Sequence, residues 1–363
     1  MRRSQCTPCA VLSQHTWAEV VAQVFHLTDG SVSRIAVARC LLVASALRVA
    51  VSAVAERVAQ MGRETVRKAL AADRPTDLDT LERYLAAGFR RHIPRSFHSC
   101  PIPIAIDTHA RPFYGDHEGT PGVVGGKPKD GAKWFWTYAT AVSLVPGQRH
   151  TLGVTAVRPG DTPDAILTRL LVQLGWAGVA VRYVLLDRGF YSAAVMNALT
   201  RRGLRFIIPM VRRGQAVERF FRRGTRGWFE YTIRCRKCRA DGATCTVAVV
   251  PGHDGRRPLV FACSAGFERL PQVVLDYRTR FGIETSYRQL GECLARTTSA
   301  DPVYRLLLVG VSLLIRAWWI STGRVTVAAL RWNVILILTP TPTGAEPHAG
   351  AQTPAPYTQP TRP

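Results

Sequence analysis

The chain has 363 residues, of which 47% are hydrophobic and 20% are charged, so it has the composition of a folded protein and disorder throughout is excluded. Lys+Arg 48 minus Asp+Glu 25 gives a net charge of +23, and because only five of these positive residues are lysines, 43 are arginines. The planar guanidinium group suits phosphate. The charge therefore favours a polyanion as partner, with nucleic acid ahead of small acidic molecules.

Cysteine usage and hydropathy favour a cytoplasmic protein. Nine cysteines at irregular spacing do not form a disulfide scaffold, and we recognise no secretion signal. Two apolar runs, residues 40–55 and 306–320, are interrupted by Arg48 and Arg316 and fall short of the roughly 20 apolar residues of a membrane span. We expect buried core helices and no membrane partner.

Residues 1–98 are rich in Ala, Val and Leu at helical spacing and are expected to form an all-helical domain. Within it, residues 51–71 fit a helix, a glycine-containing turn and a second helix. This pattern indicates either a helix-turn-helix that reads DNA or two ordinary packed helices. The second helix carries three basic side chains, Arg63, Arg67 and Lys68.

From residue 99 to about 320 the pattern changes to short β-branched runs that alternate with helices, which predicts an α/β domain. A Pro-rich segment, 339–363, has no periodicity and is expected to be disordered. Before that tail we predict strands at 102–106, 135–145, 151–157, 182–186 and 204–211, and helices at 162–175, 192–202, 271–296 and 302–319.

A basic, β-rich insertion is expected at about 212–265. Residues 201–240 contain 13 Arg/Lys against two glutamates, net +11, and three strands are predicted at 228–233, 244–250 and 259–263. One interpretation of Cys235, Cys238 and Cys245 is a zinc site. The other is that Cys238 and Cys245 face each other across a hairpin. Lys127, Lys129 and Lys133 lie among glycines in what we interpret as a flexible basic loop.

Two aspartates directly follow apolar strands. Asp107 follows residues 102–106 and Asp187 follows residues 183–186. A charged side chain next to an apolar strand costs free energy unless it has a function. Functional sites of α/β proteins form at the carboxyl ends of strands. Either aspartate alone is equally explained as a turn or capping residue.

A third acidic candidate, Glu284, lies in a helical pattern that places Tyr277, Arg280, Arg288 and Gly291 on its face. A solvated helix with an Arg280–Glu284 ion pair explains this stripe as well. Two strand-end aspartates and one helical glutamate are, however, the composition of a site for two Mg²⁺ or Mn²⁺ ions that act on phosphodiesters.

Three segments, residues 104–107, 185–191 and the Tyr-x2-Arg-x3-Glu pattern of 277–284, resemble the catalytic blocks of DDE transposases of the insertion-sequence-four family. The resemblance covers about residues 100–320. It implies an RNase H-like mixed sheet with flanking helices and a β-rich insertion before the glutamate. It also implies a prokaryotic, nucleoid-associated enzyme that works as a homodimer on double-stranded DNA. The implied metal ligands are Asp107, Asp187 and Glu284, and the implied DNA contacts are Tyr277 and Arg280.

One position departs from the family pattern, because Gly291 stands where the signature has a lysine. Either Arg288 supplies the missing charge or the chain is a decayed copy. The expected function is cleavage of element ends and their joining to target DNA. The alternatives are a metal-dependent nuclease of the same fold and a catalytically inactive protein that binds DNA.

Overall fold

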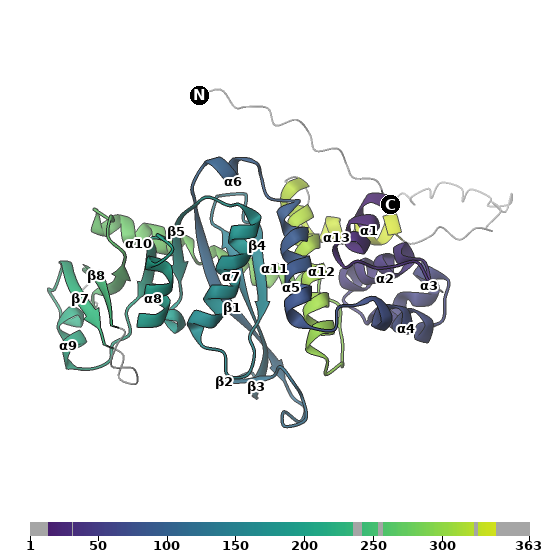
Figure 1. Ribbon diagram of the computed structural model, residues 1–363, viewed down its shortest axis with the longest axis horizontal. Coiled ribbons are helices and arrows are strands. Elements are labelled where there is room, and N and C mark those ends of the chain that lie inside the picture. The colour runs from purple at the N-terminus through teal and green to yellow at the C-terminus, as the bar shows by residue number, and fades with distance from the viewer. Residues whose placement is uncertain (1–13, 31, 235–241, 253–256, 323–325, 339–363) are drawn as a thin grey trace, which may run out of the picture.

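The computed structural model describes residues 14–30, 32–234, 242–252, 257–322 and 326–338 (Figure 1). The predicted disordered tail and two of the candidate zinc ligands, Cys235 and Cys238, lie outside these residues. The helices are α1 Gln14–Val24, α2 Arg34–Leu47, the 3-10 helix η1 Val51–Val54, α3 Ala55–Ala59, α4 Arg63–Asp73, α5 Leu78–Arg90, α6 Ser96–Ser99, α7 Pro163–Ala177, η2 Arg188–Phe190, α8 Ala193–Thr200, α9 Gln215–Glu218, η3 Arg219–Phe221, α10 Leu270–Thr279, α11 Gly282–Glu292, α12 Pro302–Thr322 and α13 Val327–Leu338. The strands are β1 Ile102–Phe113, β2 Val124–Lys129, β3 Ala132–Ser143, β4 Thr151–Ala156, β5 Val181–Leu186, β6 Phe206–Pro209, β7 Gly227–Ile233, β8 Ala243–Val250 and β9 Leu259–Cys263.

In the described part of the chain these nine strands form one mixed sheet. Its order is β2-β3-β1-β5-β6-β9-β8-β7, and β4 pairs with β3 beside β2. β1, β3 and β4 pair antiparallel, whereas β1, β5 and β6 run parallel. The order β4-β3-β1-β5-β6 is that of the expected RNase H-like domain, so the predicted fold class is confirmed.

The alternation of side chains along β1 separates two cores on opposite faces of the sheet. Ile104 and Ile106 pack under α7 and α8, while Ala105 packs with α10 and α11. Figure 1 shows α7 and α8 in front of the sheet and α10 beside its far strands. Asp107 follows the alternation and therefore belongs to the face of α10 and α11.

Local sequence explains where the flanking helices begin and end. The Asp77 carboxylate accepts a hydrogen bond from the Thr80 amide at 2.8 Å and so caps α5. Helix α7 starts with a proline, whose missing N–H costs nothing there, and ends at Gly178 with φ 66°, the left-handed conformation that glycine tolerates. The bounds of α7, Pro163–Ala177, lie within two residues of the predicted helix at 162–175.

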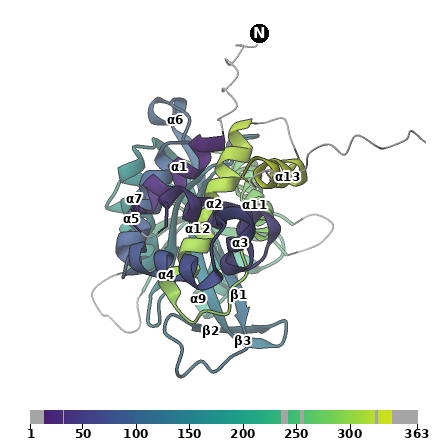
Figure 2. The ribbon, with the colours of Figure 1, turned by 90° about the vertical axis from the view of Figure 1, so that its right-hand side faces the viewer.

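The N-terminal helices share a core with the last helices of the described chain. One continuous apolar cluster joins residues of α1, α2, α4 and α5 to residues of α12 and α13 (Figure 2). Helix α12 is long and apolar enough for a membrane span over residues 302–321, but 78% of that segment is buried in the protein. A core helix, as predicted, accounts for its composition. The division of the chain at residue 98 stays a prediction.

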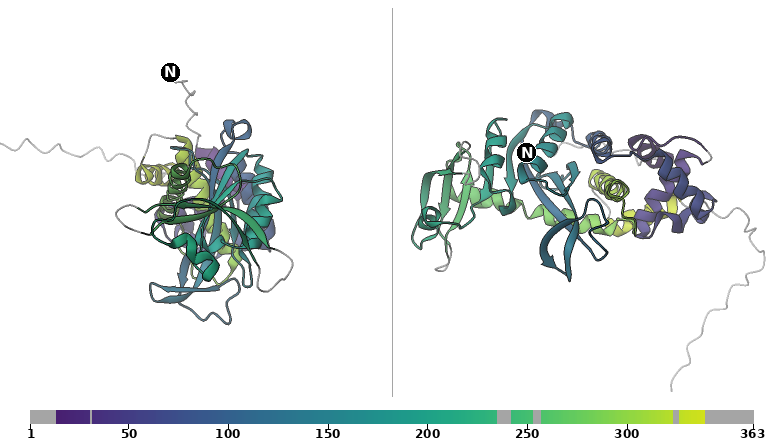
Figure 3. Two further views of the ribbon diagram at one scale, coloured as in Figure 1. Left: turned by 90° about the vertical axis from the view of Figure 1, so that its left-hand side faces the viewer. Right: turned by 60° about the horizontal axis from the view of Figure 1, so that its bottom comes forward.

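The insertion does not form a separate layer. Its strands β7, β8 and β9 extend the main sheet, because β9 pairs antiparallel with β6 (Figure 3). Several elements were missed from the sequence, among them the short helices α9 and η3. The interpreted loop around Lys127 is in fact strand β2, paired with β3, and helix α13 follows α12.

Candidate functional site

Asp107 and Asp187 lie side by side at the centre of the sheet. The parallel pairing of β1 and β5 ends at Ile106 and Leu186, and each aspartate is the next residue of its strand or loop. Paired residues of parallel strands point to the same face, so both carboxylates follow onto the face of α10 and α11. Asp107 was expected at a strand end, but β1 continues to Phe113 because β3 supplies a partner for the extra residues.

The carboxylate of Asp107 is nearly buried and held by two donors. Its Oδ2 accepts a hydrogen bond from the Arg280 guanidinium at 2.7 Å, and its Oδ1 accepts one from the Thr108 amide at 2.8 Å. The pKa of Asp107 is raised to about 6, chiefly by burial; the charge of Arg280 opposes this rise and the charge of Asp187 adds to it. The carboxylate is thus costly to ionise and depends on a neighbouring cation.

Asp187 caps the short helix η2 through a bond between its Oδ1 and the Gly189 amide, 2.9 Å long. A Cβ atom at position 189 would lie 3.1 Å from that same oxygen, which is tighter than normal contacts. The glycine therefore lets the loop fold back on the carboxylate. The carboxylate of Asp187 therefore both caps η2 and belongs to the candidate site.

Arg280 lies in a break between two helices, not on one continuous helix. The predicted helix 271–296 is divided into α10 and α11, and tight turns carry the chain between them, with the amides of Arg280 and Phe281 bonded three residues back. Gly282 opens α11, and its missing side chain leaves room for the Arg149 guanidinium. The predicted stripe along one helix face is therefore wrong, and the alternative pair of Arg280 with Glu284 is replaced by Arg280 with Asp107.

Tyr277 and Arg280 come together at the aspartates. The Arg280 guanidinium carbon lies 5.5 Å from the centre of the Tyr277 ring, and the ring also packs against Phe261 at 5.0 Å. Burial raises the pKa of Tyr277 to about 12, with the charge of Arg280 opposing. These four residues, from β1, the β5 loop and α10, form the centre of the candidate site.

Sequence reasoning missed Tyr287. Its buried hydroxyl donates to the main-chain carbonyl of Asp107 at 2.7 Å and lies 2.9 Å from the Thr140 hydroxyl. Its ring stacks on His109 with centroids 4.7 Å apart. The tyrosine thus fixes the strand at Asp107, and only its place three residues after Glu284 could have pointed to it.

Glu284 is not brought into this centre in the same way. It is exposed in the first turn of α11 and has no hydrogen bond or ion pair with any residue that the structure describes. Across the described ranges, no three His, Cys, Asp or Glu side chains stand close enough to hold a metal ion. Arg288 is also exposed on α11, and no atom lies within 4 Å of a Cβ built at Gly291.

The predicted helix, turn and helix at residues 51–71 are present as η1, α3 and α4. Of the candidate DNA contacts, Lys68 is exposed, Arg63 pairs with Glu56 at 3.5 Å, and Arg67 pairs with Glu64 at 2.6 Å. The elements are confirmed, whereas the reading of DNA stays a prediction. Of the zinc candidates only Cys245 is described, and it is buried with its thiol directed at the Tyr231 carbonyl.

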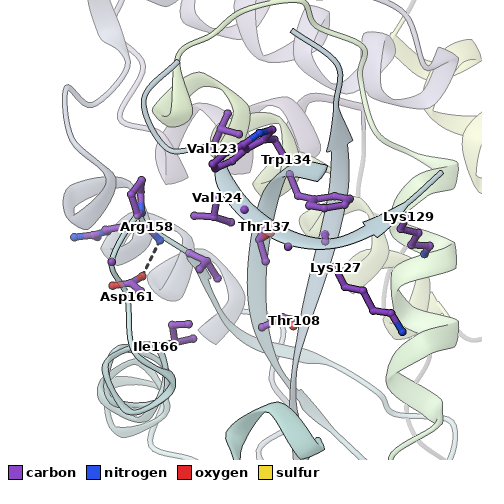
Figure 4. A pocket seen from close by; sticks show the side chains of 17 residues that line it. Thr108, Val123, Val124, Lys127, Lys129, Trp134, Thr137, Arg158, Asp161 and Ile166 are labelled. Atoms are coloured by element: carbon purple, nitrogen blue, oxygen red, sulfur yellow. Dashed lines mark hydrogen bonds between the residues drawn. The ribbon is translucent and has the colours of Figure 1, made fainter. Parts of the chain in front are cut away.

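A shallow hollow of about 680 Å³ lies on the opposite face of the sheet from Asp107. Its floor includes Thr108 and Thr137, because these positions alternate with those of the aspartate face. Figure 4 shows Lys127 and Lys129 on one side of it and Arg158 and Asp161 on the other. The hollow is therefore separate from the paired aspartates.

Comparison with solved structures finds the same fold in a protein described as a piggyBac transposase synaptic complex with hairpin DNA. The two chains superpose with a TM-score of 0.54 at 13% sequence identity, over 90% of this chain and 76% of the other. No protein-family model matches this sequence. No curated protein matches it either. The likeness is one of fold.

Proposed function

We propose that the chain is a DNA transposase, a DDE enzyme of the insertion-sequence-four type, which cleaves the ends of a DNA element and joins them to target DNA. The observation that carries this proposal is the pair of Asp107 and Asp187, set side by side where β1 and β5 part and facing Arg280. The RNase H-like sheet order, the structural neighbour and the net charge of +23 support it.

The proposal implies divalent metal ions, Mg²⁺ or Mn²⁺, two per site. Carboxylate oxygens are the ligands these hard ions prefer, and Asp107 and Asp187 offer them from adjacent strand ends. Glu284 would complete the set from the first turn of α11. When bound, such ions activate an attacking oxygen and stabilise the leaving oxygen of a phosphodiester.

The chain's own residues would position the DNA. Arg280 reaches Asp107 from the turn between α10 and α11, so its guanidinium is in place to hold a phosphate beside the carboxylates. Tyr277 would support that guanidinium through its ring, and Arg288 would add a charge one turn beyond Glu284. Arg63, Arg67 and Lys68 on α4 would contact the element end, and a homodimer would hold two ends together.

The test is cleavage of element-end DNA with Mg²⁺ or Mn²⁺ by three single variants, Asp107→Asn, Asp187→Asn and Glu284→Gln. Each removes one anionic oxygen while keeping the side chain's shape, so we expect a loss of more than about a hundredfold in rate with DNA binding retained. Chelation of the metal should abolish cleavage in the unchanged protein. Full activity in any of the three variants would remove that residue from the proposed triad.

A second candidate function is favoured by Glu284, which is exposed and has no partner in the described ranges, and by Gly291 in place of the signature lysine. It is that of an inactive copy that still binds DNA. Retained binding with no cleavage in Mn²⁺ would support it, and rescue of cleavage by Gly291→Lys would locate the defect. A pre-cut end offered with target DNA separates joining from the third alternative, a nuclease of the same fold.

A further inference from the structure

Three arginines lie near one another where β1 passes the N-terminal helices, and none has an acidic partner among the residues that the structure describes. Arg111 is on β1, directly across from Trp136 of β3, and Arg305 of α12 lies over the ring of that same tryptophan, its guanidinium carbon 4.5 Å from the ring centre. The third, Arg48, is exposed at the end of α2 with φ 61°. The carbonyl of Val49, the residue after Arg48, accepts a hydrogen bond from the Arg296 amide, which belongs to the segment before α12.

Neither Arg48 nor Arg111 has an ion pair or a side-chain hydrogen bond with any residue in the described ranges, and Arg305 donates only to a main-chain carbonyl there. The acidic groups nearby are already engaged, since Asp301 pairs with Arg74 and Glu292 pairs with Arg331. Arg111 is also repelled by Arg48 and by Arg305. Burial lowers the pKa of Arg111 and that of Arg305, and Tyr138 opposes this shift in both. The charge of Arg48 lowers the pKa of Arg111 further, and the charge of Arg111 does the same to Arg305.

Half-buried like charges without counterions destabilise a folded chain. Such an arrangement is explained when a ligand supplies the missing negative charge. Arg111 shares a face of β1 with Asp107, because the two are four residues apart on an alternating strand. Four residues span about 13 Å, close to the axial length of about four base steps of duplex DNA.

We propose that Arg48, Arg111 and Arg305 form a phosphate-binding site for the backbone of the DNA whose cleaved bond lies at Asp107. This site rests on the proposed function and adds to it a place where the DNA backbone is held between the sheet and the N-terminal helices. One DNA segment would contact Arg280 at one end and this cluster at the other. Guanidinium groups from β1, α2 and α12 would thereby hold the DNA against both parts of the protein.

The experiment measures binding of the full-length protein to a short random-sequence duplex, without metal, over a range of salt concentrations. Arg48→Gln and Arg111→Gln should each weaken binding about tenfold at low salt and reduce the slope of log affinity against log salt by about one. The matched control is Arg34→Gln, which removes the same charge from the other end of α2, where Arg34 pairs with Asp29. It should leave the slope unchanged.

A second measurement separates a binding site from a structural role. Arg111→Met keeps the aliphatic length but removes the opposed charge, so the melting temperature of the free protein should rise while DNA binding weakens. Unchanged slopes for both glutamine variants, or a lower melting temperature for Arg111→Met, would overturn the site. These experiments measure no cleavage. A negative result for the arginine variants therefore does not affect the cleavage tests of Asp107, Asp187 and Glu284, and a negative result in those tests leaves the binding measurements interpretable.

Discussion

The ion pair of Arg280 and Asp107 holds together two segments that are 173 residues apart in the sequence. Both side chains are nearly buried, at 10% and 13% exposure, so removing the cation leaves a carboxylate that water reaches poorly. Arg280→Ala should therefore lower the free energy of unfolding by on the order of 3 kcal/mol, measured by denaturant titration.

Asp107→Asn in the Arg280→Ala background should recover part of that loss, because a neutral amide needs no counterion. The exposed pair of Arg67 and Glu64 is the control, and Arg67→Ala there should have no measurable effect. An unchanged midpoint for Arg280→Ala would show that the pair does not stabilise the fold.

The hydroxyl of Tyr287 connects α11 to the strand that carries Asp107. Tyr287→Phe keeps the stacking on His109 but leaves the Asp107 carbonyl and Thr140 without this partner, so it should cost about 1–2 kcal/mol of stability. In the cleavage assay it should slow the reaction more than it weakens DNA binding, since the aspartate is displaced and the basic surface is not. Tyr114→Phe, which removes an exposed hydroxyl bonded to the Asp130 carbonyl, should change neither.

At the scale of elements, two helical glycines offer the same substitution with opposite expected signs. Gly310 of α12 faces the buried Leu85 of α5, and a Cβ there would lie 2.3 Å from a Leu85 methyl carbon. Overpacking of about 1–3 kcal/mol exceeds the gain of up to about 1 kcal/mol in helix propensity, so Gly310→Ala should destabilise the protein. Gly291 of α11 has open space around it, so Gly291→Ala should stabilise it. Thermal unfolding of both variants tests this, and two changes of the same sign would contradict the packing argument.

The secondary structure was predictable where local signals decide it. Caps, glycines and β-branched runs placed α7, α8, β4 and β5 close to their observed bounds, and the two aspartates could be selected because each follows a buried run. The extension of β1 to Phe113 was missed because it depends on pairing with β3. The break between α10 and α11 was not predicted, and at this break the Arg149 guanidinium occupies the space beside Gly282. Strand β2 was missed because its glycines and proline are typical of a loop, and only the register with β3 makes it a strand.

The same division applies to the candidate site. Which residue types belong to it could be predicted from spacing and from the resemblance, whereas the bond from Arg280 to Asp107 and the role of Tyr287 depend on tertiary contacts. Arg48, Arg111 and Arg305, which have no ion pair with any described residue, come from three distant elements. No spacing in the sequence brings them together.

At the scale of the whole molecule, the buried His150 and the half-buried His92 and His109 should make stability depend on pH. Burial lowers the pKa of His92, His109 and His150 to about 4, and the indole N–H of Trp318 donates to the His92 Nε2, which holds that ring neutral. In the unfolded chain these imidazoles have the ordinary histidine pKa of 6.5, so stability present above that pH is lost as the pH falls toward 4.

The raised pKa of Asp107 acts in the opposite sense between about 6 and its ordinary 3.8, and burial raises the pKa of Glu82 as well, but two carboxyl groups are outweighed by three imidazoles. The melting temperature should therefore fall between pH 7 and pH 4.5. His92→Gln, whose amide oxygen can still accept from Trp318, should make that fall shallower. A melting temperature that stays level over this range in the unchanged protein would contradict the assignment of neutral buried rings.

The core shared by the first and last helices has a consequence for how the protein is made. Helices α1, α2 and α5 emerge from the ribosome early, yet the apolar side chains that cover them belong to α12 and α13, more than 200 residues later. Contacts of such long sequence separation form slowly. While the sheet is being synthesised, the apolar face of the N-terminal helices stays exposed to solvent. Exposed apolar surfaces of this kind bind chaperones and cause aggregation. A chain ending before residue 302 should thus be insoluble even though all three residues proposed to bind the metal ions are present.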